Sequence, residues 1–197
     1  MKKKYIIILT FIISIVIFFI ISLIIPKETV SMDSKKFRSE YKEVSKNNVF
    51  VYSTSEEIIN ILKNGTGIIY FGYKESLWCQ KYVKYLNEVA IDMGVNKIYY
   101  YDFLNDKEKN TNAYQQIVSI LDNYLKDDEK DKQIYAPITV TVKKGEIVGF
   151  DDDVAWDLEN YQELDKYWNS DNISSIKDKL ETMISNANIN MCTEECK

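Results

Sequence analysis

Apolar and polar residues alternate along the chain in blocks that predict strands and helices in turn. Short runs rich in aromatic and β-branched residues predict strands at 49–52, 68–71, 97–103, 138–142 and 147–150. Apolar residues at helical spacing predict helices at 53–64, 77–93, 113–125, 157–166 and 172–184. Strands that alternate with helices are typical of an α/β domain, in which helices cover the faces of a central sheet.

The stretch 68–85 joins a predicted buried strand to an amphipathic helix through a short turn. At this junction lies the tetrapeptide Ser76-Leu77-Trp78-Cys79. Serine is a favourable N-cap residue, and the simplest role of Ser76 is to cap the helix, which stabilises it by about 1 kcal/mol. Cys79 alone also has a simple structural role as a small buried apolar residue.

The segment 135–150 predicts a β-hairpin that follows a proline. Pro137 stands directly before the first strand of the hairpin, where a proline does not interrupt the ladder of hydrogen bonds. A cis peptide bond is plausible at such a position. The acidic run 151–153 after the hairpin has no spaced ligand loop around it, so we expect a solvated turn rather than a cation site.

The N-terminal segment is the most apolar part of the chain. After three lysines, residues 5–25 carry no charge, and a helix of this length spans about 31 Å, the thickness of a bilayer core. Residues 1–27 are therefore predicted to be a signal anchor with one transmembrane helix. The lysines favour a cytoplasmic N-terminus, which places residues 28–197 outside the cytoplasm. The alternative is cleavage and secretion, although residues 23–26 lack the small residues of a cleavage site.

Composition divides the chain after residue 27 into three parts. Residues 28–48 are polar and are expected to form a stalk with one short helix, residues 49–187 the folded domain, and residues 188–197 a tail. The chain carries a net charge of −5, and its first 27 residues hold four lysines and no acid, so the rest carries −9. Nucleic acid is not expected as a partner, because phosphate binding needs a basic face.

Histidine is absent from the chain, which excludes Ser-His-Asp and Cys-His nucleophile activation and any histidine-containing metal site. The three cysteines are too few for an all-cysteine zinc site, and the six glycines form no phosphate-binding loop. We therefore expect no metal and no cofactor. The classes of function that remain are thiol chemistry, carboxylate chemistry and a role without catalysis.

Three segments in order, FGYKESLWCQKYVKYL, NKIYYYDF and YAPITVTVKKGEIVGF, resemble a branch of membrane-anchored thioredoxin-like proteins of low-GC Gram-positive bacteria. This branch is near the bacteriocin transport accessory type, and the resemblance covers about residues 49–150. It implies an α/β fold of thioredoxin-like type, with three layers and a central mixed sheet flanked by helices. Fold resemblance alone does not establish an activity.

The resemblance also carries over to individual residues. The Cys-x-x-Cys motif of the family falls on Ser76 to Cys79, Trp78 takes the place of the aromatic residue often found before the second cysteine, and Pro137 matches the cis-proline. It implies that Trp78, Ala136 and Pro137 line a substrate groove. Ser76 departs from the family: its hydroxyl stays neutral at pH 7 and has no histidine as base, so ordinary dithiol chemistry by residues 76 and 79 is excluded.

A second register places Cys79 at the first cysteine of the motif and Tyr82 at the lost second one. In that register Cys79 would be an exposed thiol able to attack a disulfide. We prefer the first register, because residues 72–75 have the length of the turn that leads into the motif. There Cys79 lies one turn inside the helix and is shielded.

Cys192 and Cys196 lie in the tail, four residues apart. On a helix their Cα atoms would be about 6 Å apart, which is within disulfide range. So short a loop would stabilise the fold little, so a redox or tethering purpose is the better explanation of such a bond. One arrangement pairs Cys192 with Cys196 and leaves Cys79 free; another pairs Cys79 with one of the two.

These observations predict a membrane-anchored, extracytoplasmic thioredoxin-like protein concerned with thiol-disulfide exchange or redox homeostasis. Cys79, with Ser76 at the degenerate position, would carry the exchange on an exported peptide or protein. The alternative is a catalytically inactive thioredoxin-fold module that binds an exported peptide or partner protein. A glutathione-binding role for the Ser76 hydroxyl is a third, less supported hypothesis.

Overall fold

The computed structural model describes residues 32–126, 132–156 and 164–188. The predicted membrane segment 5–25 lies outside these ranges, as do Cys192, Cys196 and most of the predicted helix 157–166. Within the described ranges, no helix combines the length and the apolar character needed to cross a membrane.

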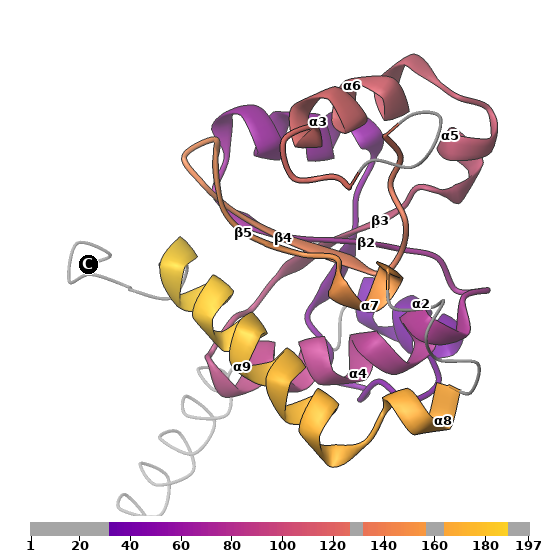
Figure 1. The fold of residues 1–197 in the computed structure, drawn as a ribbon, viewed down its shortest axis with the longest axis vertical. Helices are drawn as coiled ribbons and strands as arrows, with labels where there is room; N and C mark the ends of the chain where they lie inside the picture. Colours follow the sequence, from indigo (N-terminus) through magenta and orange to yellow (C-terminus); the bar gives the residue numbers. More distant parts are fainter. Residues whose placement is uncertain (1–31, 127–131, 157–163, 189–197) are drawn as a thin grey trace, which may run out of the picture. The chain divides into compact units, whose positions relative to one another are not determined.

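Five strands form one mixed sheet in the order β1-β3-β2-β4-β5 (Figure 1). Strands β1 (Phe50–Tyr52), β3 (Ile98–Asp102) and β2 (Gly67–Gly72) run parallel. Strands β4 (Ile138–Lys143) and β5 (Glu146–Asp151) form an antiparallel hairpin, and β4 pairs antiparallel with β2. The central position of β2 means that the turn after it, which leads into the Ser76 tetrapeptide, starts from the middle of the sheet.

Helices cover both faces of the sheet (Figure 1). Helices α3 (Ser55–Asn64) and α6 (Asn112–Leu121) pack together on one face, and α4 (Leu77–Asp92) and α9 (Ser170–Ala187) on the other. The remaining described helices are α2 (Met32–Glu40), α5 (Leu104–Glu108), α7 (Asp153–Trp156) and α8 (Leu164–Tyr167). This arrangement confirms the predicted α/β class with a central mixed sheet flanked by helices.

Most predicted elements lie within a few residues of their expected bounds, because strong end signals fix them. Helix α3, for example, begins with a capping box: Thr54 caps the helix, and its side chain accepts a hydrogen bond from Glu57 N–H while the Glu57 carboxylate accepts one from Thr54 N–H. Residues 104–112, expected as a charged connection, contain the short helix α5.

Buried tyrosines fill the space between the sheet and α4. Tyr70 of β2 stacks on Tyr82 of α4, with ring centroids 6.0 Å apart, and on Tyr100 of β3, 5.7 Å apart. The Tyr70 hydroxyl lies so close to Gly72 that a Cβ there would collide with it. Glycine at 72 is therefore what allows the tyrosine at 70 to lie along the strand toward the tetrapeptide.

Residues 32–44 are part of this core, which differs from the polar stalk that we expected for residues 28–48. Phe37, Tyr41 and Val44 are buried, and Phe37 stacks on Phe50 of β1 with ring centroids 4.0 Å apart. The expected short helix is present as α2, but it packs on β1. Phe37 in the helix, with Tyr41 and Val44 in the turn that follows it, is enough to anchor a helix whose composition is otherwise polar.

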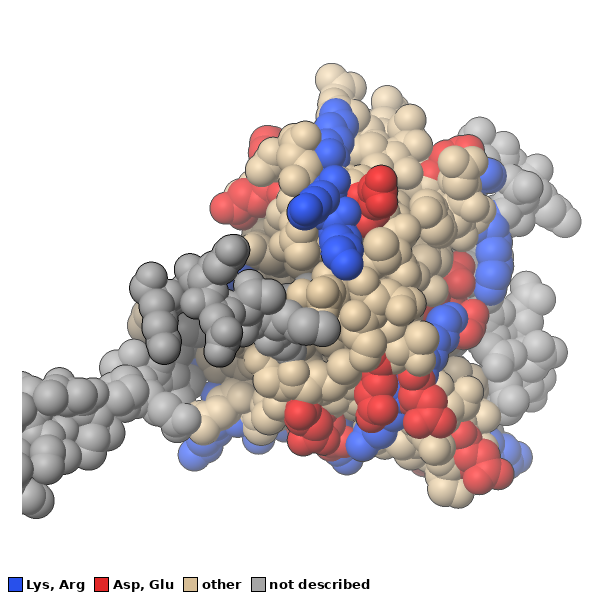
Figure 2. Space-filling view, turned by 90° about the vertical axis from the view of Figure 1, so that its left-hand side faces the viewer, with Lys and Arg blue, Asp and Glu red and all other residues tan. Residues whose placement is uncertain are grey.

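The acidic run 151–153 also differs from the solvated turn that we expected. Asp151 is 2% exposed; its carboxylate accepts a hydrogen bond from the Tyr82 hydroxyl at 2.6 Å and pairs with Lys179 Nζ at 2.9 Å. This pairing ties β5 to α4 and α9, and it supplies the opposite charge that a buried carboxylate requires. Elsewhere charges are dispersed: on the face shown in Figure 2, acidic side chains accompany a short row of basic ones.

We expect Phe37→Ala to lower the free energy of unfolding by about 3–5 kcal/mol, because it removes a buried ring from the contact between α2 and the sheet. Urea unfolding of the full-length protein in detergent measures this loss. Met32→Ala, at a position 81% exposed on the same helix, is the matched control and should change stability by less than about 0.5 kcal/mol. Equal, small effects of the two substitutions would show that α2 is a solvated stalk.

Candidate functional site

The tetrapeptide lies at the point where the chain leaves the carboxyl end of β2 and enters α4. Ser76 is the N-cap of α4: its backbone is extended, and its Oγ accepts a hydrogen bond from Cys79 N–H at 3.2 Å. This confirms the capping role predicted for Ser76. The hydroxyl satisfies one of the free N–H groups at the start of the helix, so it already has a structural task.

Cys79 lies in the first turn of α4 and is completely buried. Its thiol is free. Burial raises the pKa of the thiol above its ordinary value, and the nearby Ser76 hydroxyl, Tyr70 hydroxyl and Tyr73 backbone offset this only in part. The Asp102 carboxylate raises that pKa further. Because only a thiolate attacks disulfides, Cys79 in this position is a poor nucleophile.

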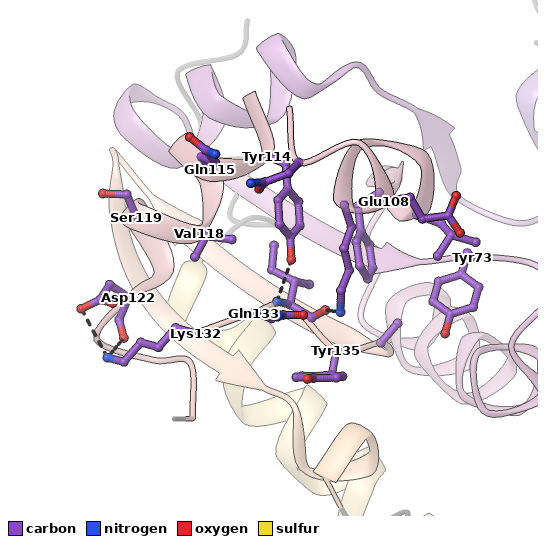
Figure 3. A pocket seen from close by; sticks show the side chains of 16 residues that line it. Tyr73, Glu108, Tyr114, Gln115, Val118, Ser119, Asp122, Lys132, Gln133 and Tyr135 are labelled. Atoms are coloured by element: carbon purple, nitrogen blue, oxygen red, sulfur yellow. Dashed lines mark hydrogen bonds and ion pairs between the residues drawn. The ribbon is translucent and has the colours of Figure 1, made fainter. Parts of the chain in front are cut away.

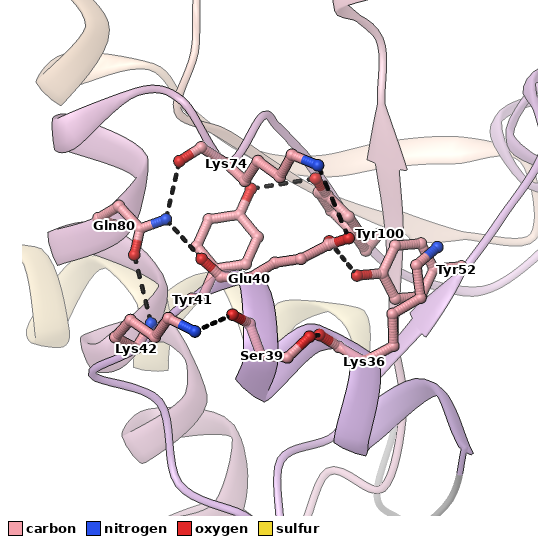
Figure 4. Close-up of polar contacts among 9 residues, drawn as sticks. All are labelled: Lys36, Ser39, Glu40, Tyr41, Lys42, Tyr52, Lys74, Gln80 and Tyr100. Carbon is pink, nitrogen blue, oxygen red and sulfur yellow. Dashed lines mark hydrogen bonds and ion pairs between the residues drawn. The ribbon is translucent and has the colours of Figure 1, made fainter.

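A polar network joins the tetrapeptide to the end of α2 (Figure 4). The side-chain amide of Gln80 donates to the carbonyl oxygens of Lys74 and Glu40, both at 2.8 Å, and accepts a hydrogen bond from Lys42 N–H at 3.3 Å. One side chain thus binds the turn before Ser76 to the C-terminal end of α2. This contact holds α2 in place on the side of the core where Cys79 is buried.

The ring of Trp78 is half-buried and belongs to an aromatic cluster with α8 and the residue after it. Its centroid lies 5.1 Å from that of Tyr167 and 6.3 Å from that of Trp168, and Trp168 also stacks on Tyr85 at 5.3 Å. Leu77, in contrast, is 66% exposed although it is apolar. The exposed apolar side chain at the start of α4 is therefore Leu77.

The Ala136–Pro137 peptide bond is cis, as the position of this proline before a strand suggested. Both residues are buried. Ile138, which follows, pairs with Phe71 near the end of β2. Gly72 ends β2, and the turn to Ser76 begins there. The structure therefore brings the cis bond and the tetrapeptide to the same edge of the sheet, the one formed by the carboxyl end of β2.

An open cleft of about 980 Å³ begins at this edge and runs between α5, α6 and the segment 132–136 (Figure 3). Its lining includes Tyr73, in the turn three residues before Ser76, and Ala136 of the cis bond. No sequence signal indicates this cleft, because its walls come from four separate segments and include no motif.

Cys192 and Cys196 lie outside the described residues, so their pairing stays a prediction. Within the described ranges, no group of three or more Cys, Asp or Glu side chains is arranged to hold a metal ion. Comparison of the chain with protein-family models, with curated proteins and with solved structures gives no match.

We expect Ser76→Ala to lower the free energy of unfolding by about 1 kcal/mol, because the Cys79 N–H loses the hydroxyl that caps it. Ser174→Ala, on an exposed position of α9, is the control and should be neutral or slightly stabilising. Chemical denaturation of both variants measures the difference. An unchanged stability in Ser76→Ala would contradict a capping role.

The raised pKa of Cys79 predicts a loss of stability at alkaline pH. An unfolded thiol ionises near pH 8.5, whereas the buried thiol keeps its proton to higher pH. Its contribution to stability is therefore complete below about pH 8.5 and falls as the pH rises above that value, by up to about 1.4 kcal/mol per pH unit.

We expect Cys79→Ala to remove this slope between about pH 8.5 and 9.5, below the range in which tyrosines ionise. The measurement is the free energy of unfolding at a series of pH values for both proteins. Absolute stability will differ because of the cavity left by the sulfur, so the slope is the relevant quantity. Identical slopes would show that Cys79 is not shielded in the native state.

Proposed function

We propose that this protein is a thioredoxin-fold module that binds an exported peptide or partner protein and does not itself carry out thiol-disulfide exchange. The complete burial of Cys79 behind the Ser76 cap carries the proposal. A redox motif needs one accessible sulfur of low pKa at the start of the helix. Here the accessible position holds a hydroxyl, and the sulfur is buried with a raised pKa.

Four features support the thioredoxin-like part of the proposal. They are the sheet order β1-β3-β2-β4-β5 with an antiparallel hairpin at one edge, the helices on both faces, the capped helix that starts at the end of the central strand, and the cis bond before the hairpin. Each agrees with what the sequence resemblance implies.

The edge of the sheet around the tetrapeptide supports a binding role. Leu77 exposes an apolar side chain at the start of α4, and Tyr73 is half-exposed in the turn before it. Exposed and half-exposed apolar side chains of this kind suit contact with the side chains of a bound polypeptide. Thiol-disulfide exchange, the activity that the resemblance suggests, would require α4 and α2 to separate enough to expose Cys79.

We propose further that residues 5–25 anchor the protein in the membrane, with the N-terminus cytoplasmic and the folded domain outside. The charge of −9 on residues 28–197 supports partners other than nucleic acid. An extracytoplasmic location would bring the binding edge to polypeptides that leave the cell.

We expect the native protein to reduce no disulfide substrate and Ser76→Cys to gain that activity. The Ser76 hydroxyl contacts the Cys79 thiol, so a sulfur at position 76 would lie within reach of Cys79 at the start of the helix. Turnover of a fluorescent disulfide substrate with dithiothreitol as reductant measures the gain, and Ser76→Ala is the control without a new thiol.

Alkylation and mass spectrometry of the native protein complete this experiment. We expect Cys79 to react only after denaturant is added. Rapid labelling of Cys79 in the native state, or disulfide reduction by the unmodified protein, would overturn the proposal and restore the exchange function. A well-folded but inactive Ser76→Cys variant would contradict the register that places Ser76 at the attacking position.

A further inference from the structure

We propose that the cleft between α6 and residues 132–136 binds a short, uncharged segment of peptide chain, with an apolar side chain placed between aromatic walls. This inference rests on the proposed binding function and assigns it to a specific site and a class of ligand. The cleft measures about 980 Å³, at the upper end of the range for pockets that enclose drug-sized ligands, so it can hold several residues of a peptide.

One wall of the cleft is held rigid by two side chains that fix the segment 132–136 (Figure 3). Tyr114 of α6 accepts a hydrogen bond from Ile134 N–H at 3.1 Å, and Lys107 of α5 donates to the Ile134 carbonyl oxygen at 2.8 Å. The Lys107 ammonium also lies 4.1 Å from the ring centroid of Tyr135. The wall is therefore formed before any ligand arrives, which lowers the entropic cost of binding.

The opposite end of the cleft carries a second fixed aromatic group. Tyr73 packs edge-on against Phe103 with ring centroids 5.9 Å apart, and Phe103 stacks on the ring of Tyr114 at 6.4 Å. Tyr73 and Tyr135 are both half-exposed. These two rings offer the apolar surface that an aromatic or aliphatic side chain of a ligand would cover.

Among the described residues, the charged side chains that line the cleft are two lysines and two acids, so their charges cancel. Lys132 pairs with Asp122, with Nζ 3.3 Å from Oδ2, and Lys107 is balanced by the exposed carboxylate of Glu108. A cleft with no net charge attracts neither phosphates nor polyanions, which need several uncompensated cations. Its electrostatics match an uncharged ligand.

The polar groups of the lining suit peptide bonds. Gln115 and Gln133 each present a side-chain amide that makes no hydrogen bond to any other described residue. An amide both donates and accepts hydrogen bonds, as a peptide bond does, so the two groups can pair with ligand backbone without leaving a donor or an acceptor unsatisfied.

The test uses full-length protein in detergent with labelled isoleucine and valine methyl groups. The probe is the blocked pentapeptide acetyl-Gly-Phe-Ser-Phe-Gly-amide, and its acidic and basic analogues carry Glu or Lys in place of each Phe. Maltotriose serves as a neutral sugar. We expect the phenylalanine peptide to shift the methyl signals of Val118 and Ile134 with a Kd on the order of 1 mM, and the other probes to bind at least about fivefold more weakly.

Ser119→Trp blocks the cleft from an exposed position of α6 and should abolish these shifts without unfolding the protein. Ser174→Trp makes the same change on an exposed position of α9, away from the cleft, and should leave them intact. Urea unfolding of both variants shows that each is folded.

The outcomes separate this inference from the proposed function. Peptide-induced shifts confined to the Val83 methyl groups, the labelled groups of α4 nearest to Leu77 in sequence, and insensitive to Ser119→Trp would overturn the cleft as the site and leave a binding module intact. Binding of maltotriose in preference to the peptide, or equal binding of the charged analogues, would overturn the ligand class. No response to any peptide at several times the expected Kd would overturn the cleft as a peptide site, whereas the proposed function is overturned only by native labelling of Cys79 or by disulfide reduction.

Discussion

The contact between the central strand β2 and helix α4 is the interaction on which the rest of the structure depends. Tyr70 and Tyr82 stack across it, and Gly72 leaves room for the Tyr70 hydroxyl. The first turn of α4 must start close to the strand, so Cys79 falls directly onto this tyrosine layer and is buried. The chemistry of the tetrapeptide follows from that placement. The packing that stabilises the fold also raises the pKa of the Cys79 thiol.

The serine at position 76 decides the balance between stability and reactivity at the start of α4. A serine hydroxyl caps a helix well, whereas a reactive thiolate needs the same N-terminal N–H groups for its own stabilisation. At position 76 these groups serve the cap, since Cys79 N–H donates to the hydroxyl. Gln80 then binds the preceding turn to α2, which closes the core over the sulfur. The geometry at the start of α4 therefore favours stability of the fold over reactivity of the Cys79 thiol.

Sequence reasoning found the elements whose signals are local. The serine at the start of the helix 77–93, the strand before the turn and the proline before the hairpin each predicted a feature that the structure contains. It missed features that depend on distant partners. The burial of Asp151 depends on Tyr82 and Lys179, 69 and 28 residues away, and no local pattern reveals such a pair. For residues 28–48 the polar composition predicts a stalk with one short helix; the helix is present, and the burial of Phe37 and Tyr41 against the sheet is what the composition does not reveal.

In the candidate site, too, the features with a local sequence signal could be predicted and those built from distant segments could not. The tetrapeptide and Pro137 could be found from the sequence, because each is a compact motif with a stated place in a fold. The cleft could not, since Tyr73, Lys107, Tyr114 and the segment 132–136 meet only after the sheet has formed. Lys107 is one of many lysines in the sequence and gains its role from the Ile134 carbonyl and the Tyr135 ring that lie beside it. The chemistry of the tetrapeptide therefore does not determine the cleft: its rigidity comes from α5, α6 and their contacts with residues 132–136, none of which involves the Cys79 sulfur. The two can vary independently, because they are built from different parts of the chain.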